Sequence, residues 1–156
     1  MKIKTREEIK KIVEELKKEG RKIVTCNGSF DLLHIGHVKF LEEAKKQGEI
    51  LIVGLNSDSS IKKYKDETRP IIQQQDRAEM LAALEAVDYI TIYDEEVPMP
   101  FLEAVKPDIH VNGEEYGYEC IEAETVKKNN GKIYLVKMYK DFSTTKLIEK
   151  IIKHGK

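Results

Sequence analysis

Residues 22–37, "KIVTCNGSFDLLHIGH", decide the fold of this chain. The β-branched and apolar residues at 22–26 predict a short buried strand. From Ile35 onward, apolar residues recur at helical spacing, which predicts an amphipathic helix that ends near Gly48. A strand that passes through a polar, glycine-containing loop into a helix is the first half of a βαβ unit.

The same alternation repeats along the rest of the chain. Further strands are predicted at 50–56, 89–93, 108–111 and 132–136, and further helices at 77–86, 100–105, near 119–128 and after residue 143. Thr5 and Glu8 form a capping-box pattern, which predicts an N-terminal helix within 1–20. Strands separated by helices favour right-handed crossovers and a mostly parallel sheet covered on both faces. We therefore expect an α/β fold with a Rossmann-like, doubly wound sheet of about five strands, in a single domain over 1–156.

Composition narrows the classes of partner. The 156 residues include 27 Lys and Arg against 28 Asp and Glu, which gives a net charge of −1 at pH 7. We expect no nucleic-acid and no membrane partner from this balance. Two cysteines, Cys26 and Cys120, form neither a disulfide framework nor a zinc site. The charged N-terminus and the absence of a long apolar stretch in the sequence predict a cytoplasmic protein.

The loop before the second predicted helix is the candidate site. In doubly wound sheets, ligands bind beyond the carboxyl ends of the strands, and a helix N-terminus there favours phosphate. His34 and His37 are three residues apart and would share one side of the first helical turn, where Gly36 would let a phosphate approach the backbone. We predict no metal site, because the sequence places no companion Cys, Asp or Glu at ligand spacing on a second helix. The glycine-rich motifs of dinucleotide enzymes and ATPases are absent from the sequence.

The motif "HIGH" (34–37) after a strand resembles the signature of the nucleotidyltransferase superfamily, and "FSTTKLIEKI" (142–151) resembles the segment that opens the last helix in its short cytidylyltransferase-like members. Within that group, 22–151 is similar to the adenylyltransferase domain of ADP-heptose synthase. The matching stretches are "NGSFDLLHIGHVKFLEEAKKQG", "LIVGLNSDSSIKKYKD", "RPI", "DRAEMLAALEAVDYI", "KPDIHVNGEEY" and "STTKLIEKI". Two departures are "VNGEEY" (111–116), where the family has Val-Lys-Gly-Gly-Asp-Tyr, and Ser29, where it has Cys.

The resemblance implies transfer of AMP from ATP to heptose 1-phosphate, with Mg²⁺ bound mainly through ATP. A sugar phosphate is already an anionic nucleophile, so catalysis needs positioning and charge stabilisation rather than a general base. The implied catalytic residues are His34, His37, Lys62, Lys65 and Arg77. The implied nucleotide-binding residues are Asn27, Gly28, Ser29, Phe30, Asp31, Gly36, Gly113, Ser143 and Thr144, and the implied acceptor-binding residues are Asn56, Asp58, Arg69 and Asn112. A homodimer and a separate upstream sugar kinase are further expectations.

Several of these residues also have ordinary structural interpretations. The lysines could be solvated, Arg77 could pair with Asp76 or Glu79 at the surface, and Asp31, Asp58 or Ser143 could cap a helix. If Glu114 faces the site, its carboxylate should repel phosphate. Two other functions remain open, namely a cytidylyltransferase for glycerol 3-phosphate or a related polyol phosphate, and a nucleotide-binding module without turnover.

Overall fold

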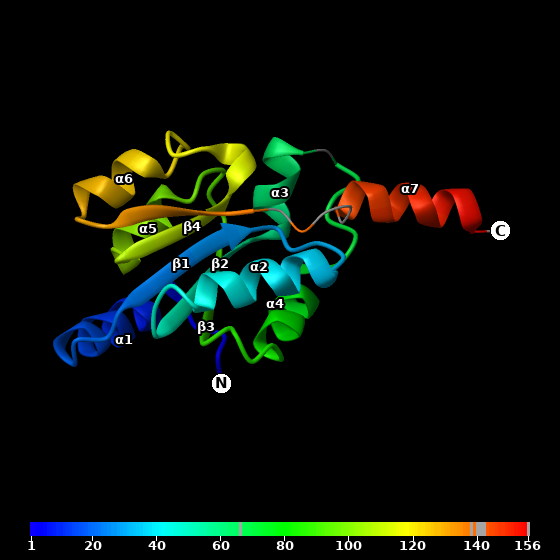
Figure 1. The fold of residues 1–156 in the computed structure, drawn as a ribbon. Helices are drawn as coiled ribbons and strands as arrows, with labels where there is room; N and C mark the ends of the chain where they lie inside the picture. The colour runs from blue at the N-terminus through cyan, green and yellow to red at the C-terminus, as the bar shows by residue number, and fades with distance from the viewer. Residues whose placement is uncertain (66, 138, 140–142, 156) are drawn as a thin grey trace.

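Strand β1 (Ile23–Gly28) lies at the centre of the molecule (Figure 1). In the computed structural model, which describes residues 1–65, 67–137, 139 and 143–155, it belongs to a five-stranded sheet of order β3-β2-β1-β4-β5. All neighbouring strands pair in parallel. The other strands are β2 (Ile50–Asn56), β3 (Tyr89–Tyr93), β4 (Ile109–Gly113) and β5 (Lys132–Val136). The predicted α/β fold with a five-stranded parallel sheet is confirmed.

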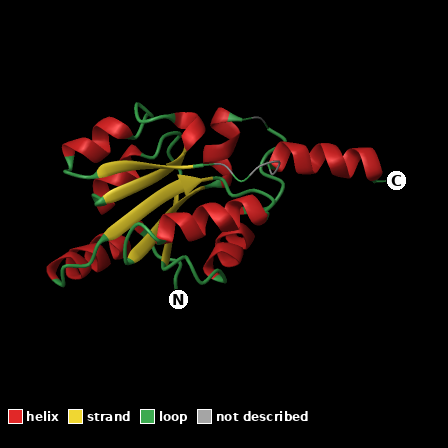
Figure 2. Ribbon diagram, in the orientation of Figure 1, coloured by secondary structure: helices red, strands yellow, loops and turns green. Residues whose placement is uncertain are grey.

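Helices cover both faces of this sheet, as Figure 2 shows. The helices are α1 (Arg6–Lys18), α2 (Ile35–Lys45), α3 (Asp58–Tyr64), α4 (Gln74–Ala82), α5 (Met99–Val105), α6 (Ala123–Lys128) and α7 (Thr144–His154). One apolar core includes Leu41 of α2 and Leu81 of α4, and the other includes Ile9 of α1 and Phe101 of α5. Alternate residues along β1 and β2 enter opposite cores, which is the doubly wound arrangement.

The structure changes some of the predicted boundaries. Helix α4 begins and ends earlier than the predicted 77–86. It ends early because the chain turns there toward β3, with the N–H of Leu84 donating to the carbonyl of Leu81. Helix α6 begins after 119, and a 3₁₀ turn over Glu114–Tyr116 was not expected. The capping box of Thr5 and Glu8 is confirmed.

Helix α7 projects from the body of the molecule (Figure 1). The rest of the described chain leaves Ile151 and Ile152 of this helix largely uncovered, since they are 55% and 74% exposed. Phe142, which opens the predicted motif before this helix, lies outside the described residues. Among the described residues, no helix combines the length and the apolar character that crossing a bilayer requires.

Candidate functional site

A pocket of about 230 Å³ opens at the carboxyl edge of the sheet, and we call it the histidine pocket. It brings together eleven of the predicted residues from segments far apart in the sequence. Those that line it are Asn27, Gly28, Ser29, Phe30, His34, Gly36, His37, Asn112, Gly113, Ser143 and Thr144, together with Phe40, Glu115 and Tyr116. The pocket therefore joins the end of β1, the start of α2, the end of β4 and the start of α7, as expected for a doubly wound sheet.

The two histidines form one unit at the start of α2. His34 is the N-cap, and its Nδ1 accepts a hydrogen bond of 3.1 Å from the N–H of Gly36. The Nδ1 of His37 accepts from the N–H of His34 at 3.4 Å, and the two rings stack with centroids 3.8 Å apart. Because Nδ1 is the acceptor in both rings, each neutral imidazole carries its proton on Nε2. The pair thus combines side-chain donors with the positive end of a helix, which suits a phosphate.

The protonation state of the pair follows from its surroundings. Burial, with smaller contributions from the neighbouring His34 and Lys65 and against the opposing effect of Asp31, lowers the pKa of His37 to about 4. Burial also lowers the pKa of His34. At neutral pH both rings are therefore uncharged hydrogen-bond donors rather than cations.

The loop between β1 and α2 has a strained backbone. Phe30 and Leu32 have φ angles of 46° and 51°, a left-handed conformation that residues other than glycine rarely adopt. The Asp31 carboxylate, which is 2% exposed, accepts hydrogen bonds from the N–H groups of Ile71 and Ile72 at 2.8 and 3.0 Å. Asp31 therefore fixes the loop and is not the helix cap.

Two further side chains complete this attachment. Arg69 pairs with the Asp31 carboxylate at 3.3 Å, and its side chain does not line the histidine pocket. The Thr144 hydroxyl donates to the Asp31 carbonyl at 2.8 Å, which links the start of α7 to the loop. Ser143 caps α7 by accepting from the N–H of Lys146, and it also lines the pocket, so its two predicted roles coincide.

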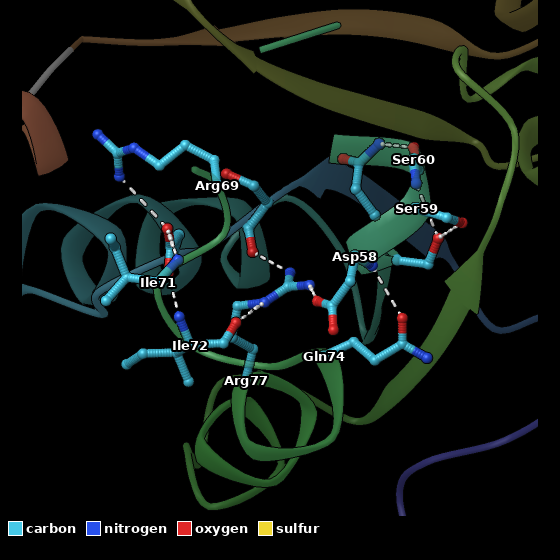
Figure 3. A network of polar contacts seen from close by, with 12 residues as sticks. Asp58, Ser59, Ser60, Arg69, Ile71, Ile72, Gln74 and Arg77 are labelled. Carbon is cyan, nitrogen blue, oxygen red and sulfur yellow. Dashed lines mark hydrogen bonds and ion pairs between the residues drawn. The ribbon is translucent and has the colours of Figure 1, made fainter. Parts of the chain in front are cut away.

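Arg77 is fully buried, with a side-chain exposure of 0%. Its guanidinium donates to the Asp58 carboxylate at 2.8 Å, to the Ile72 carbonyl at 2.9 Å and to the Ser29 carbonyl (Figure 3). The side chain has no exposed surface, and its ion pair is with Asp58 rather than with Asp76 or Glu79. Its guanidinium ties the loop after β1 to α3, and the catalytic role that the resemblance implies for Arg77 stays a prediction.

The caps and lysines of α3 also differ from expectation. Ser57, not Asp58, is the N-cap, because its hydroxyl accepts from the N–H of Ser60. The Lys65 Nζ donates to the Ser29 hydroxyl at 3.2 Å and so stands at the edge of the histidine pocket. Lys62 is exposed on α3 and does not line the histidine pocket, so the catalytic role that the resemblance implies for it stays a prediction.

A second pocket, of about 400 Å³, lies beside the first, and we call it the asparagine pocket. It shares Asn27, Gly28, Asn112 and Tyr116 with the histidine pocket. Its remaining lining residues are Asn56, Tyr64, Tyr93, Glu96, Val97, Pro98, Ile121 and Glu122. Of the predicted acceptor residues, Asn56 and Asn112 line it, whereas Asp58 and Arg69 are held elsewhere in ion pairs.

Sequence reasoning missed two buried members of this pocket. Tyr93, 2% exposed, ends β3, and burial raises the pKa of its phenol, although hydrogen bonds from Asn56 and Asn27 oppose the rise. Its position at the carboxyl end of a predicted strand could have indicated a ligand-binding residue, since ligands bind beyond these strand ends. Glu122, 5% exposed, accepts from the Asn112 amide at 3.1 Å. No local sequence pattern marks Glu122 as a pocket residue. It reaches Asn112 of β4 only because the loop that follows β4 folds back onto the end of that strand.

The two glutamates of "VNGEEY" lie differently. Glu115 lines the histidine pocket, and its carboxylate covers Gly113 so closely that a Cβ at Gly113 would approach it to 2.2 Å. Glu114 is exposed and lines neither of the two pockets. Of these two glutamates, Glu115 is therefore the one whose carboxylate faces a phosphate bound in the histidine pocket. Within the described part of the chain, no group of three His, Cys, Asp or Glu side chains is arranged to hold a metal ion.

Solved structures share this architecture. The lipopolysaccharide core biosynthesis protein from Thermoplasma volcanium superposes with a TM-score of 0.63 at 31% identity, over 79% of this chain and 100% of its own. Pantoate-beta-alanine ligase from Francisella tularensis, in complex with an ATP analogue and β-alanine, gives a TM-score of 0.67 at 19% identity, over 99% of this chain and 80% of its own. The second likeness shows the fold alone.

Sequence comparison gives the family. The bifunctional protein HldE of Aliarcobacter butzleri is 46% identical over 99% of this chain and 32% of its own length, and that of Syntrophotalea carbinolica is 40% identical over 97% and 31%. This chain thus spans about a third of the length of these relatives. The cytidylyltransferase-like family model matches residues 25–150, which include all the residues that line both pockets. The chain therefore belongs to the cytidylyltransferase-like family of nucleotidyltransferases.

Proposed function

We propose that this chain transfers AMP from ATP to heptose 1-phosphate and releases pyrophosphate. The observation that carries the proposal is the wall shared by the two pockets, which Asn27, Gly28, Asn112 and Tyr116 form. A nucleotide bound in the histidine pocket and a sugar phosphate bound in the asparagine pocket would meet across this wall. The choice of ATP and heptose is supported by the sequence resemblance and by the similarity to HldE.

The reaction needs little covalent chemistry from the protein. An oxygen of the acceptor phosphate attacks the α-phosphorus, and the bond from that phosphorus to the oxygen bridging to the β-phosphate breaks, so pyrophosphate leaves with the electron pair. Negative charge grows on the α-phosphate oxygens, where the Nε2–H of His37 and the N-terminus of α2 would donate. The N-terminus of α7, with Ser143, would bind other phosphate oxygens, and Lys65 would add positive charge from the edge.

Magnesium is proposed to arrive with the nucleotide. Asp31 is the buried carboxylate of the loop between β1 and α2. Its oxygens already accept hydrogen bonds from two backbone N–H groups and pair with Arg69. Mg²⁺ bound to ATP commonly keeps several waters and few protein ligands, so a site whose buried carboxylate is already engaged suits an ion held by the phosphates.

A homodimer, a separate sugar kinase and a cytoplasmic location stay predictions.

The test combines two nucleotides with two acceptors. ATP or CTP is incubated with Mg²⁺ and either heptose 1-phosphate or glycerol 3-phosphate, and pyrophosphate is measured. We expect the highest kcat/KM for ATP with heptose 1-phosphate. Equal or better use of CTP with glycerol 3-phosphate would make the protein a polyol-phosphate cytidylyltransferase. Nucleotide binding without pyrophosphate from any pair would instead indicate a module without turnover.

A further inference from the structure

Two carboxylates line the asparagine pocket. Glu122 lies in its wall and Glu96 at its exposed edge, and among the described residues no Lys, Arg or His lines it. Within the described chain, no ion pair involves Glu122. The Glu122 carboxylate favours protonation of the buried His110, but burial outweighs it and holds the pKa of His110 well below its ordinary value. The His110 ring is therefore neutral and does not offset the negative charge of Glu122.

The other polar groups in the pocket are neutral. Asn27, Asn56 and Asn112 present amides, and Tyr93 presents a phenol. The Asn27 Oδ1 is buried and has no hydrogen-bond partner within the described protein, so an acceptor remains to be satisfied. Amides, phenols and a carboxylate together match the donors and acceptors of several hydroxyl groups.

Asn112 shows how this chain sets the charge of the pocket. At this position the resemblance described above has Lys, whereas here the uncharged Asn112 donates to Glu122 at 3.1 Å, and the two side chains are 6% and 5% exposed. A buried carboxylate raises the free energy of an anion bound beside it, and the low exposure limits screening by solvent.

We propose that Glu122 makes the asparagine pocket select an acceptor whose sugar body is neutral or cationic and exclude one that carries a second anionic group. This inference rests on the proposed function, since it assumes that the acceptor sugar enters this pocket. The single phosphate of the acceptor is then accommodated at the shared wall, on the side of the histidine donors, while hydroxyl groups bind the amides and Glu122.

The test compares ligands that differ at one substituent. Glucose 1-phosphate, glucosamine 1-phosphate and glucuronic acid 1-phosphate are titrated calorimetrically into the protein saturated with a non-hydrolysable ATP analogue. For the unaltered protein, we expect glucuronic acid 1-phosphate to bind at least about tenfold more weakly than glucose 1-phosphate, and glucosamine 1-phosphate to bind at least as well.

Two variants assign the effect. Glu122→Gln keeps an acceptor for the Asn112 amide, so it should fold, and it should reduce the penalty for the uronic acid to about threefold or less. Glu119→Gln is the matched control, because that side chain is on the same loop and 91% exposed, and it should leave the ratio unchanged.

The outcomes separate the two proposals. Equal binding of the neutral and anionic sugars, or an unchanged ratio in Glu122→Gln with an unchanged melting temperature, would overturn the selectivity while leaving adenylyl transfer intact. If none of the three sugar phosphates binds and heptose 1-phosphate gives no pyrophosphate, both proposals fail.

Discussion

The two pockets share a wall but differ in how they are built and in the polar groups that they present. The histidine pocket is made from a strained loop and two helix N-termini, and it presents N–H and hydroxyl donors. The asparagine pocket combines side chains at the ends of four strands with residues of the following loops, and it presents amides, phenols and carboxylates. One edge of one sheet therefore provides an environment for phosphate beside an environment for hydroxyl groups.

The pockets also differ in what holds them in shape. Strand ends are fixed by the parallel ladder, so Asn56 and Tyr93 need few additional anchors. The loop at 29–33 lies outside the ladder and depends on Asp31, Arg77 and Thr144. We therefore expect the histidine pocket to be much more sensitive than its neighbour to changes outside its lining.

The largest effect is expected for Arg77→Met. This change leaves the Asp58 carboxylate and the Ser29 carbonyl without their donor, and breaking a buried pair in this way typically costs about 3–5 kcal/mol of unfolding free energy. Denaturant unfolding measures it. Arg21→Met is the matched control, because the Arg21 and Glu49 side chains are 50% and 46% exposed, and it should leave the free energy of unfolding close to that of the unaltered protein. A loss below about 1 kcal/mol for Arg77→Met would show that the loop does not depend on this anchor.

The next effect concerns the chemistry in the histidine pocket. His37→Ala removes a donor proposed to strengthen as charge develops on the α-phosphate, which typically lowers kcat by about 10²–10³, or about 2.7–4 kcal/mol. The Kd for nucleotide should rise far less. Single-turnover rates, Kd and melting temperature measured on one preparation separate these effects, with the exposed His154→Ala as control. A folded His37→Ala variant that turns over normally would leave the helix N-terminus as the sole phosphate donor at this point.

The smallest effect distinguishes the two glutamates beside Gly113. Glu115→Gln removes a carboxylate from the histidine pocket and should tighten ATP binding by about 0.2–1 kcal/mol, since the side chain is exposed and partly screened. Glu114→Gln should leave the Kd unchanged, because that side chain lies outside both pockets. Calorimetric titration of ATP at low and high salt measures both. Weaker ATP binding in Glu115→Gln would mean that the carboxylate contacts a donor on the nucleotide.

The sequence by itself determined the alternation of strands and helices, the capping box of α1 and the association of the histidine motif with the start of α2. These features are local, because helical and strand periodicity and capping depend on residues within a few positions of one another. The family motifs added Ser143 and Thr144, which the structure brings to the same pocket.

Only the tertiary structure decided what Asp31, Arg77 and Glu122 do. Asp31 meets Ile71 and Ile72, which are 40 and 41 residues away, and its carbonyl meets Thr144 across 113 residues. Arg77 has charged neighbours in sequence, yet the turn into α4 directs it inward to Asp58. Such partners are set by how parallel strands bring their carboxyl ends together and how the intervening loops pack, and no short stretch of sequence encodes that geometry.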